Sequence, residues 1–184
     1  MTLTDAITRV RAILKETTES FFKDSEITTW LNEGNKDFHS WKGIQDIWTT
    51  SVDGETEIGL DTSMVRLHKL TFIAYGETEE NLINSDTYDI FKDRIIFDQK
   101  LKHGTLTWYG ERLPVIVSVG TTAFEIDPAF ESALVEYATF KGFEKDEDNR
   151  MSVALASYQT LKMMWERKHF DKYNGEKTIL RKKF

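Results

Sequence analysis

The chain has 184 residues, a net charge of −7 and no cysteine. Its 40% hydrophobic and 30% charged residues are typical of a folded domain. The lack of cysteine excludes disulfides and thiolate zinc sites, and the acidic balance argues against a general nucleic-acid binder. No apolar run approaches the roughly 18 residues of a membrane span, and Asp5 and Arg9 lie where a signal peptide would be apolar. Composition therefore predicts a soluble domain, intracellular or carried in a particle, without a membrane partner.

Two amphipathic helices are predicted at the start of the chain. Apolar residues recur at helical spacing over 3–14, where Thr2 and Asp5 form a capping box. A second helix is expected at about 25–41, capped by Asp24 or Ser25. Gly34 lies on its apolar face. A bare backbone there would let another helix cross closely, although a merely tolerated glycine fits the pattern equally well.

The segment 44–125 is predicted to be rich in β-structure. Asp53-Gly54 is typical of a tight turn, so residues 47–52 and 55–60 are expected to form a hairpin. The other expected strands or extended segments are 64–75, 94–97, 105–109 and 113–119.

Helix is predicted to return at Asp127-Pro128, since aspartate caps helices and proline favours their first turn. A long last helix is expected at 147–171. The predicted fold class is therefore α+β: a mainly α four-helix bundle with a β-rich insertion between helices 2 and 3 and an extended C-terminal tail. The expected domains are a helical bundle of residues 1–43 and 126–172, a β-rich insertion of 44–125, and a docking tail of 173–184.

Motifs of catalysis and metal binding are missing from the sequence. It has no HExxH, G-x-S-x-G, GxxxxGK or GxGxxG pattern. Its four histidines do not pair at metal spacing, and the acidic cluster 144–148 is typical of a solvated helix start. We therefore expect no enzyme activity, no catalytic residues, no metal and no cofactor.

The last residues differ in charge from the rest of the chain. Residues 172–184 hold five basic side chains and one acidic one, which leaves −11 on the residues before them. Apolar residues interleave with the basic ones, and this pattern favours a docking segment over a frayed, solubilising end, which remains the alternative. The expected docking residues are Tyr173, Ile179, Leu180, Arg181, Lys182, Lys183 and Phe184.

Aromatic residues of the β-rich segment are the second set of candidate contacts. Aromatic side chains are enriched at protein interfaces, and exposed sheet edges invite partner strands. The alternative is that these residues cap the local sheet core. The candidates for contacts with a neighbouring subunit or ring are Trp48, Tyr75, Tyr88, Trp108 and Tyr109.

Two stretches carry a resemblance to a known family. SEITTWLNEG at 25–34 and FEIDPAFESALVEYA at 124–138, with the order of the elements over about 3–172, resemble the phage head-to-tail adaptor proteins, also called connector or head completion proteins. The resemblance implies a structural virion protein, made in the host cytoplasm, that forms a homo-oligomeric ring at the capsid vertex, commonly of twelve subunits. Its implied partners are the portal protein and a tail or stopper protein.

The resemblance also implies that residues 173–184 insert into the portal and that DNA passes through the ring without specific binding. A net negative lumen would repel phosphate, and the charge of the body is consistent with this. The alternative function is a small nucleic-acid-binding or regulatory α+β domain.

Overall fold

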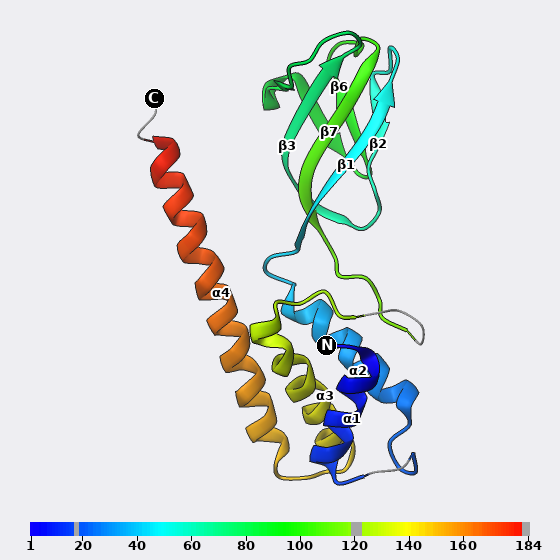
Figure 1. The fold of residues 1–184 in the computed structure, drawn as a ribbon, viewed down its shortest axis with the longest axis vertical. Coiled ribbons are helices and arrows are strands. Elements are labelled where there is room, and N and C mark those ends of the chain that lie inside the picture. Colours follow the sequence, from blue (N-terminus) through cyan, green and yellow to red (C-terminus); the bar gives the residue numbers. More distant parts are fainter. Residues whose placement is uncertain (17–18, 119–122, 182–184) are drawn as a thin grey trace. The chain divides into compact units, whose positions relative to one another are not determined.

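The computed structural model describes the backbone of residues 1–16, 19–118 and 123–181, and the side chains of these residues up to His169. The chain divides into two compact units (Figure 1). The helical unit comprises Met1–Lys42 and Pro114–Phe184, and the β unit comprises Gly43–Leu113. The segment 114–125, expected to belong with the β-rich residues, thus groups with the helices.

The capping residues predict the starts of α1 and η2, whereas α2 begins one residue earlier than its expected cap allows. The Thr2 hydroxyl oxygen accepts the backbone N–H of Asp5 at the start of α1, and Asp127 caps the short 3-10 helix η2. α2 begins at Asp24 after Lys23, whose backbone N–H donates to the Glu26 carboxylate. The helical elements are α1 (Leu3–Leu14), α2 (Asp24–Phe38), η2 (Pro128–Phe130), α3 (Glu131–Lys145) and α4 (Met151–Arg181).

The helices do not surround one core, so the prediction of a mainly α four-helix bundle with a β insertion is wrong. The chain is 41% helical and 26% strand, with two antiparallel sheets. Within the helical unit, α3 packs against α1, α2 and α4 and lies between two apolar clusters. One cluster joins α1, α2 and α3 with Val117 and Phe124, and the other joins Phe38 and Phe130 to Tyr158 and Trp165 of α4.

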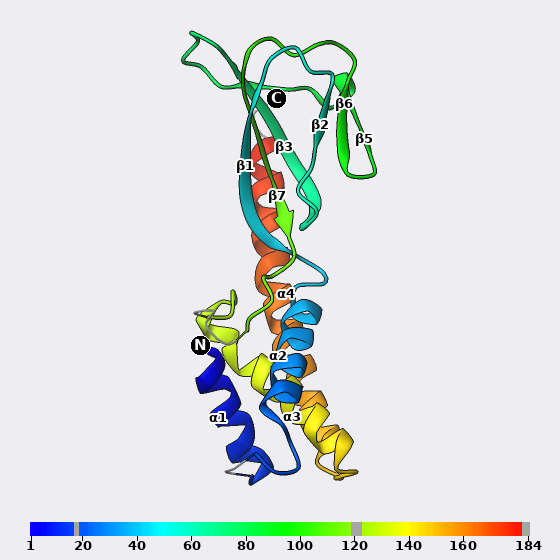
Figure 2. The same cartoon turned by 90° about the vertical axis from the view of Figure 1, so that its right-hand side faces the viewer.

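The prediction of an extended C-terminal tail is also wrong for the residues up to Arg181, which are helical. α4 continues as a helix of 31 residues from Met151 to Arg181 (Figure 2). Its buried side chains, as far as His169, are Ala154, Tyr158 and Trp165, which lie at helical spacing on one stripe. Residues 182–184 of the expected tail lie outside the described residues.

Gly34 is the site of a close helix approach. A Cβ placed on Gly34 would lie 2.9 Å from the Cγ and Cδ1 atoms of Tyr137, which lies on α3. The first interpretation of this glycine is therefore confirmed: its bare backbone is what admits the Tyr137 ring between α2 and α3.

The β unit holds two sheets whose inner residues share one core. The larger sheet has the order β1-β7-β3-β4 and the smaller has β2-β6-β5. The buried core residues are Val52, Leu70, Ile95, Phe97, Leu106 and Trp108. The elements are β1 (Ile44–Val52), β2 (Glu57–Gly59), β3 (Met64–Ala74), β4 (Asn81–Leu82), η1 (Ser85–Thr87), β5 (Tyr88–Phe91), β6 (Arg94–Phe97) and β7 (Gly104–Arg112).

The expected hairpin of 47–52 and 55–60 does not form. Gly54 has the positive φ of 88° that the Asp-Gly turn predicts. The chain after this turn, however, enters the smaller sheet, where β2 pairs with β6, while β1 pairs along its whole length with β7. The positive φ of Gly54 is therefore as expected, but the hairpin that the Asp-Gly pair predicted is not formed.

The buried hydroxyl of Thr139 in α3 is expected to lower the stability of the fold. Thr139 is 1% exposed, and its Oγ1 has no hydrogen-bond partner among the described residues. We expect Thr139→Val to raise the free energy of unfolding by about 1 kcal/mol, because the shape is kept and an unpaired polar group is removed. Denaturant unfolding measures this. Thr160→Val is the control: the exposed Thr160 hydroxyl donates to Ala156 O, so stability should hardly change. A destabilised Thr139→Val protein would contradict the prediction.

Candidate interaction surfaces

Among the residues that the structure describes, potential metal ligands do not gather into one cluster. In the described part of the chain, no three His, Cys, Asp or Glu residues lie together as metal ligands would. None of the helices in the described ranges is both long and apolar enough to span a bilayer. The contacts expected from the sequence lie on the β unit and at the end of α4.

The structure separates the five aromatic candidates of the β unit. Tyr75 is 82% exposed and meets His103 edge-on, with ring centroids 5.2 Å apart. Trp48 and Tyr88 are half-buried against the apolar core of the β unit. Trp108 is 4% exposed and belongs to that core, as the alternative interpretation of this set proposed. Tyr75 is thus the fully accessible aromatic side chain of the set.

Tyr109, the fifth candidate, is held by charged neighbours. Its hydroxyl donates to Glu80 at 3.1 Å, and the Lys69 ammonium lies 4.9 Å from the ring centroid. The hydrogen bond from Thr71 is the main cause that lowers the pKa of Glu80, and the bond to Glu80 raises the pKa of Tyr109. The phenol therefore stays a neutral donor, fixed beside an anion and a cation at the sheet surface.

The expected docking residues fall at the end of α4. Tyr173, Ile179, Leu180 and Arg181 lie on the helical backbone of α4, so they are not part of an extended strand. Lys182, Lys183 and Phe184 lie outside the described residues. The helix places successive residues about 1.5 Å apart along its axis, so the backbone from Trp165 to Arg181 spans about 24 Å.

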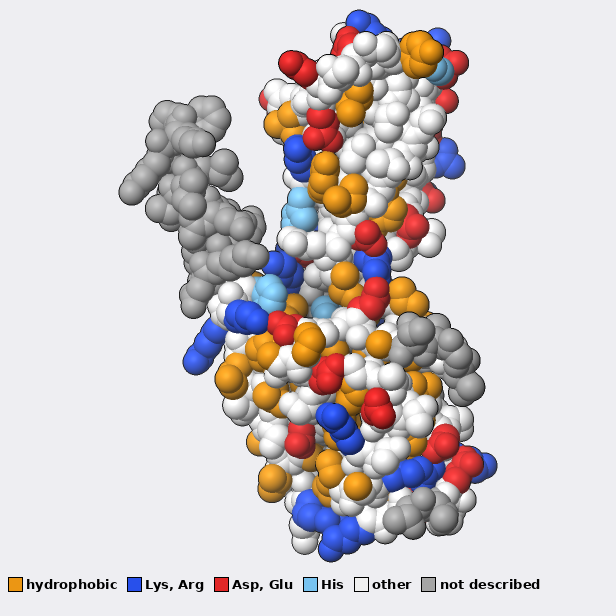
Figure 3. Space-filling view, viewed as in Figure 1, with side chains coloured by type: hydrophobic (Ala, Val, Ile, Leu, Met, Phe, Trp, Pro, Cys, Tyr) orange, Lys and Arg blue, Asp and Glu red, His pale blue; other side chains and the backbone are white. Residues whose placement is uncertain are grey.

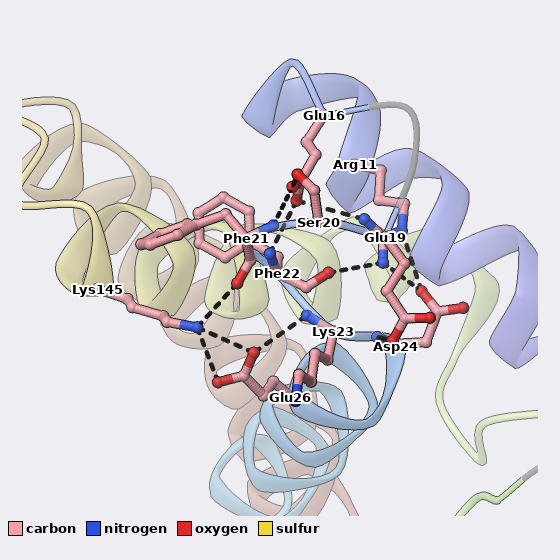
Figure 4. Close-up of polar contacts among 10 residues, drawn as sticks. All are labelled: Arg11, Glu16, Glu19, Ser20, Phe21, Phe22, Lys23, Asp24, Glu26 and Lys145. Atoms are coloured by element: carbon pink, nitrogen blue, oxygen red, sulfur yellow. Dashed lines mark hydrogen bonds and ion pairs between the residues drawn. The ribbon is translucent and has the colours of Figure 1, made fainter.

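The connection between α1 and α2 contains a polar cluster that the sequence analysis missed (Figure 4). The Glu16 carboxylate accepts the backbone N–H groups of Phe21 at 2.6 Å and Phe22 at 3.0 Å, together with the Ser20 hydroxyl. Arg11 donates to the Asp24 carboxylate and, at 2.8 Å, to Phe22 O. These bonds occupy backbone groups that a loop would otherwise leave to water.

Lys145 attaches the same loop to the end of α3. Its ammonium donates to Phe21 O at 3.0 Å and to the Glu26 carboxylate at 2.9 Å, and it lies 4.7 Å from the centroid of the Phe21 ring. Phe21 is nevertheless 50% exposed. The Phe21 side chain is therefore exposed, while its backbone N–H is bonded to Glu16 and its carbonyl oxygen to Lys145. The one signal in the sequence was the pair Phe21-Phe22 between two polar flanks.

The contribution of Glu16 to stability is expected to depend on pH. Its hydrogen bond from Ser20, followed by those from the Phe21 and Phe22 amides, lowers its pKa from 4.5 to about 2. A carboxyl group whose pKa is lower in the folded than in the unfolded chain stabilises the fold at any pH above its unfolded pKa. For Glu16 this stabilisation is lost as the pH falls from 4.5 to about 2. We expect Glu16→Gln to unfold at lower denaturant than the unmodified protein at neutral pH, with a difference that shrinks across this interval.

The control for Glu16 is Glu33→Gln, a change at an exposed carboxylate of α2. Its difference from the unmodified protein at neutral pH should be small, because the Glu33 side chain is exposed. Equal pH profiles for the two variants would show that the bonds of Glu16 do not stabilise the fold.

Large apolar side chains are exposed on both units. On the face shown in Figure 3, apolar side chains are more numerous over the helical unit than over the β unit. The most exposed ones, in order of their accessible fraction, are Tyr75, Ile116, Leu82, Val153, Phe91 and Ile47. Single exposed apolar residues are normal, so a contact surface needs further evidence from the elements that carry them.

The sequence of residues 1–178 matches the family of SU10 adaptor proteins. The chain therefore belongs to this family of phage head-to-tail adaptors, and the resemblance seen in the sequence is confirmed. A search of curated proteins found no match. Membership gives the chain a structural role in the phage particle, in contact with head and tail components.

Proposed function

We propose that this chain assembles as a ring beneath the portal at the capsid vertex, where it joins the capsid to the tail and extends the DNA channel. The family match over residues 1–178 is the observation that carries this proposal. Twelve subunits is the stoichiometry that the resemblance implies. In this role the protein positions other proteins and catalyses no reaction.

The end of the chain is the proposed contact with the portal. Residues 173–184 combine basic with apolar and aromatic side chains. The α4 helix, which packs on α3 through a stripe ending at Trp165 among the described side chains, leads into this segment. Apolar anchors would supply most of the affinity, because burying a leucine or phenylalanine is worth about 1.5–3 kcal/mol.

The β unit is the proposed contact with neighbouring subunits or with the tail or stopper protein. Tyr75 is exposed at its surface, and Tyr109, Trp48 and Tyr88 are half-buried. Trp108 is part of the core against which Trp48 and Tyr88 pack. The net charge of −11 outside the last thirteen residues supports a channel that repels DNA.

Electron microscopy tests the proposal directly. Particles made without this protein should be filled heads that lack tails, and the purified protein mixed with portal should add a ring. Normal tailed particles in its absence would overturn the proposal. A gel shift at physiological salt should show no DNA binding, and strong binding there would favour the nucleic-acid-binding alternative.

A further inference from the structure

Strand β1 leaves one hydrogen-bonding edge of the larger sheet unpaired. It lies at the end of the order β1-β7-β3-β4, and among the described residues β7 is the one strand that pairs with it. The Ile47 N–H also donates to the Asp46 carboxylate at 2.9 Å. Its nine residues match those of β7 one to one from Ile44↔Arg112 to Val52↔Gly104, without a bulge. The outer backbone groups of β1 therefore form a row of donors and acceptors, and a pairing strand would displace the Asp46 carboxylate from the Ile47 N–H.

The other strand edges of the unit are short or protected. β3 shows register shifts between Met64 and Arg66 and between Leu67 and Lys69, and β4 covers it at Thr71 and Phe72. The free edges of β2 and β5 belong to strands of three and four residues. Bulges, lysines and short edge strands are devices that prevent pairing between chains, and β1 has none of them.

The side chains of β1 also favour pairing. Its outward positions 45, 47, 49 and 51 are exposed and uncharged, and Ile47 is 59% exposed. Its single charged residue, Asp46, is already paired with Arg112, whose Nε lies 2.5 Å from Oδ2. On the inner face Trp48 is half-buried, so part of its side chain is still accessible.

We propose that the free protein pairs with a second copy of itself through antiparallel β1 strands. The second copy's β1 is the free edge of matching length and regularity. With Trp48 opposite its counterpart, Asp46 faces Thr50 of the second copy, and Ile47 faces Thr49. A parallel pair in register would instead place Asp46 against Asp46, which is destabilising.

This inference concerns the protein before assembly and goes beyond its proposed place in the particle. An exposed regular edge of nine residues promotes aggregation unless a partner covers it. A two-fold β1 pair closes on itself and leaves no free edge on that side of either sheet. The adaptor would then reach the particle as a dimer, and the pair would open if β1 is needed for another contact.

Light scattering of the purified protein, without portal or heads, tests the pairing. The mass should be about twice the 21.4 kDa of one chain. The double variant Ile47→Lys, Thr49→Lys brings four lysines together across the proposed pair and should be monomeric. The corresponding variant Ile47→Glu, Thr49→Glu should also be monomeric, and an equal mixture of the two should recover the dimer.

Val65→Lys is the matched control, because Val65 is 54% exposed on β3 of the same sheet. This variant should remain a dimer. If the Ile47 variants lose their circular dichroism, Gln45→Lys with Ser51→Lys tests the same edge at two polar positions. The inference is wrong if the unmodified protein is a monomer. It is also wrong if the charged β1 variants have the same mass in light scattering as the unmodified dimer. A mixture that stays monomeric also overturns it. Attachment to heads is a separate readout, whose failure would count against the proposed function alone.

Discussion

Deleting residues 174–184 is expected to leave both units folded and to abolish attachment to filled heads. The deletion removes no described residue of the two helical-unit clusters or of the β core, so circular dichroism and thermal unfolding should show folded protein with slightly less helix. Attachment is measured by sedimentation of heads with the added protein. A truncated protein that still joins heads would show that this segment is an ordinary chain end.

Two double variants separate the apolar from the basic part of the segment. Leu180→Ala with Phe184→Ala should weaken attachment more than Lys182→Ala with Lys183→Ala. Exposed ion pairs are each worth about 0–1 kcal/mol, whereas burying one large apolar side chain is worth about 1.5–3. The salt dependence provides the control, because the lysine contribution should fade at high salt and the apolar one should persist.

Gly34→Val is expected to cost about 1–3 kcal/mol of stability in the helical unit. The new Cβ would meet the root of the Tyr137 ring, whose Cβ lies at 3.0 Å and whose Cγ lies at 2.9 Å. Those atoms lie next to the backbone of α3, so the helices must move apart to relieve the contact. Denaturant unfolding followed by helical circular dichroism measures the loss.

Gly142→Val is the matched control for Gly34, since Gly142 is also a buried helical glycine of this unit. Its added Cβ would meet the two terminal methyl groups of Leu14 at 2.7 and 2.8 Å, and a flexible side-chain end moves aside at little cost. We therefore expect a smaller loss at Gly142. Equal losses at the two positions would show that the approach of Tyr137 to Gly34 is not a specific constraint.

The local signals in the sequence predicted the elements better than their partners. Thr2 and Asp127-Pro128 mark helix starts because capping depends on neighbouring residues alone. The Asp53-Gly54 turn is equally local. The pairing of β1 with β7 is not, since it depends on contacts such as Trp48 opposite Trp108 that join distant parts of the chain.

The helical arrangement was mispredicted for a related reason. Each helix has an apolar stripe, but a stripe does not show whether it shares its core with one neighbour or with several. Val117 and Phe124, which lie outside the helices, complete one core, while Trp165 joins the other. The spacing of apolar residues therefore could not predict that α3 contributes to two separate apolar clusters.

The sequence predicted some of the contact residues and missed others. Exposure distinguishes Tyr75 from Trp108, and the sequence alone does not show which of two aromatic residues in a strand points to the core. The cluster around Glu16 was missed because its bonds to backbone amides depend on how the loop folds back. The role of residues 173–184 stays a prediction.

The β unit begins and ends at one place, because Ile44 at the start of β1 pairs with Arg112 at the end of β7. The Glu111 side chain also accepts the backbone N–H of Gly43 at 3.1 Å, next to that pair. A segment whose two ends are neighbours can be exchanged between genes as one block, since the flanking helices need to bridge only a short gap. We therefore expect that the β unit can be replaced as one block with little strain on the flanking helices.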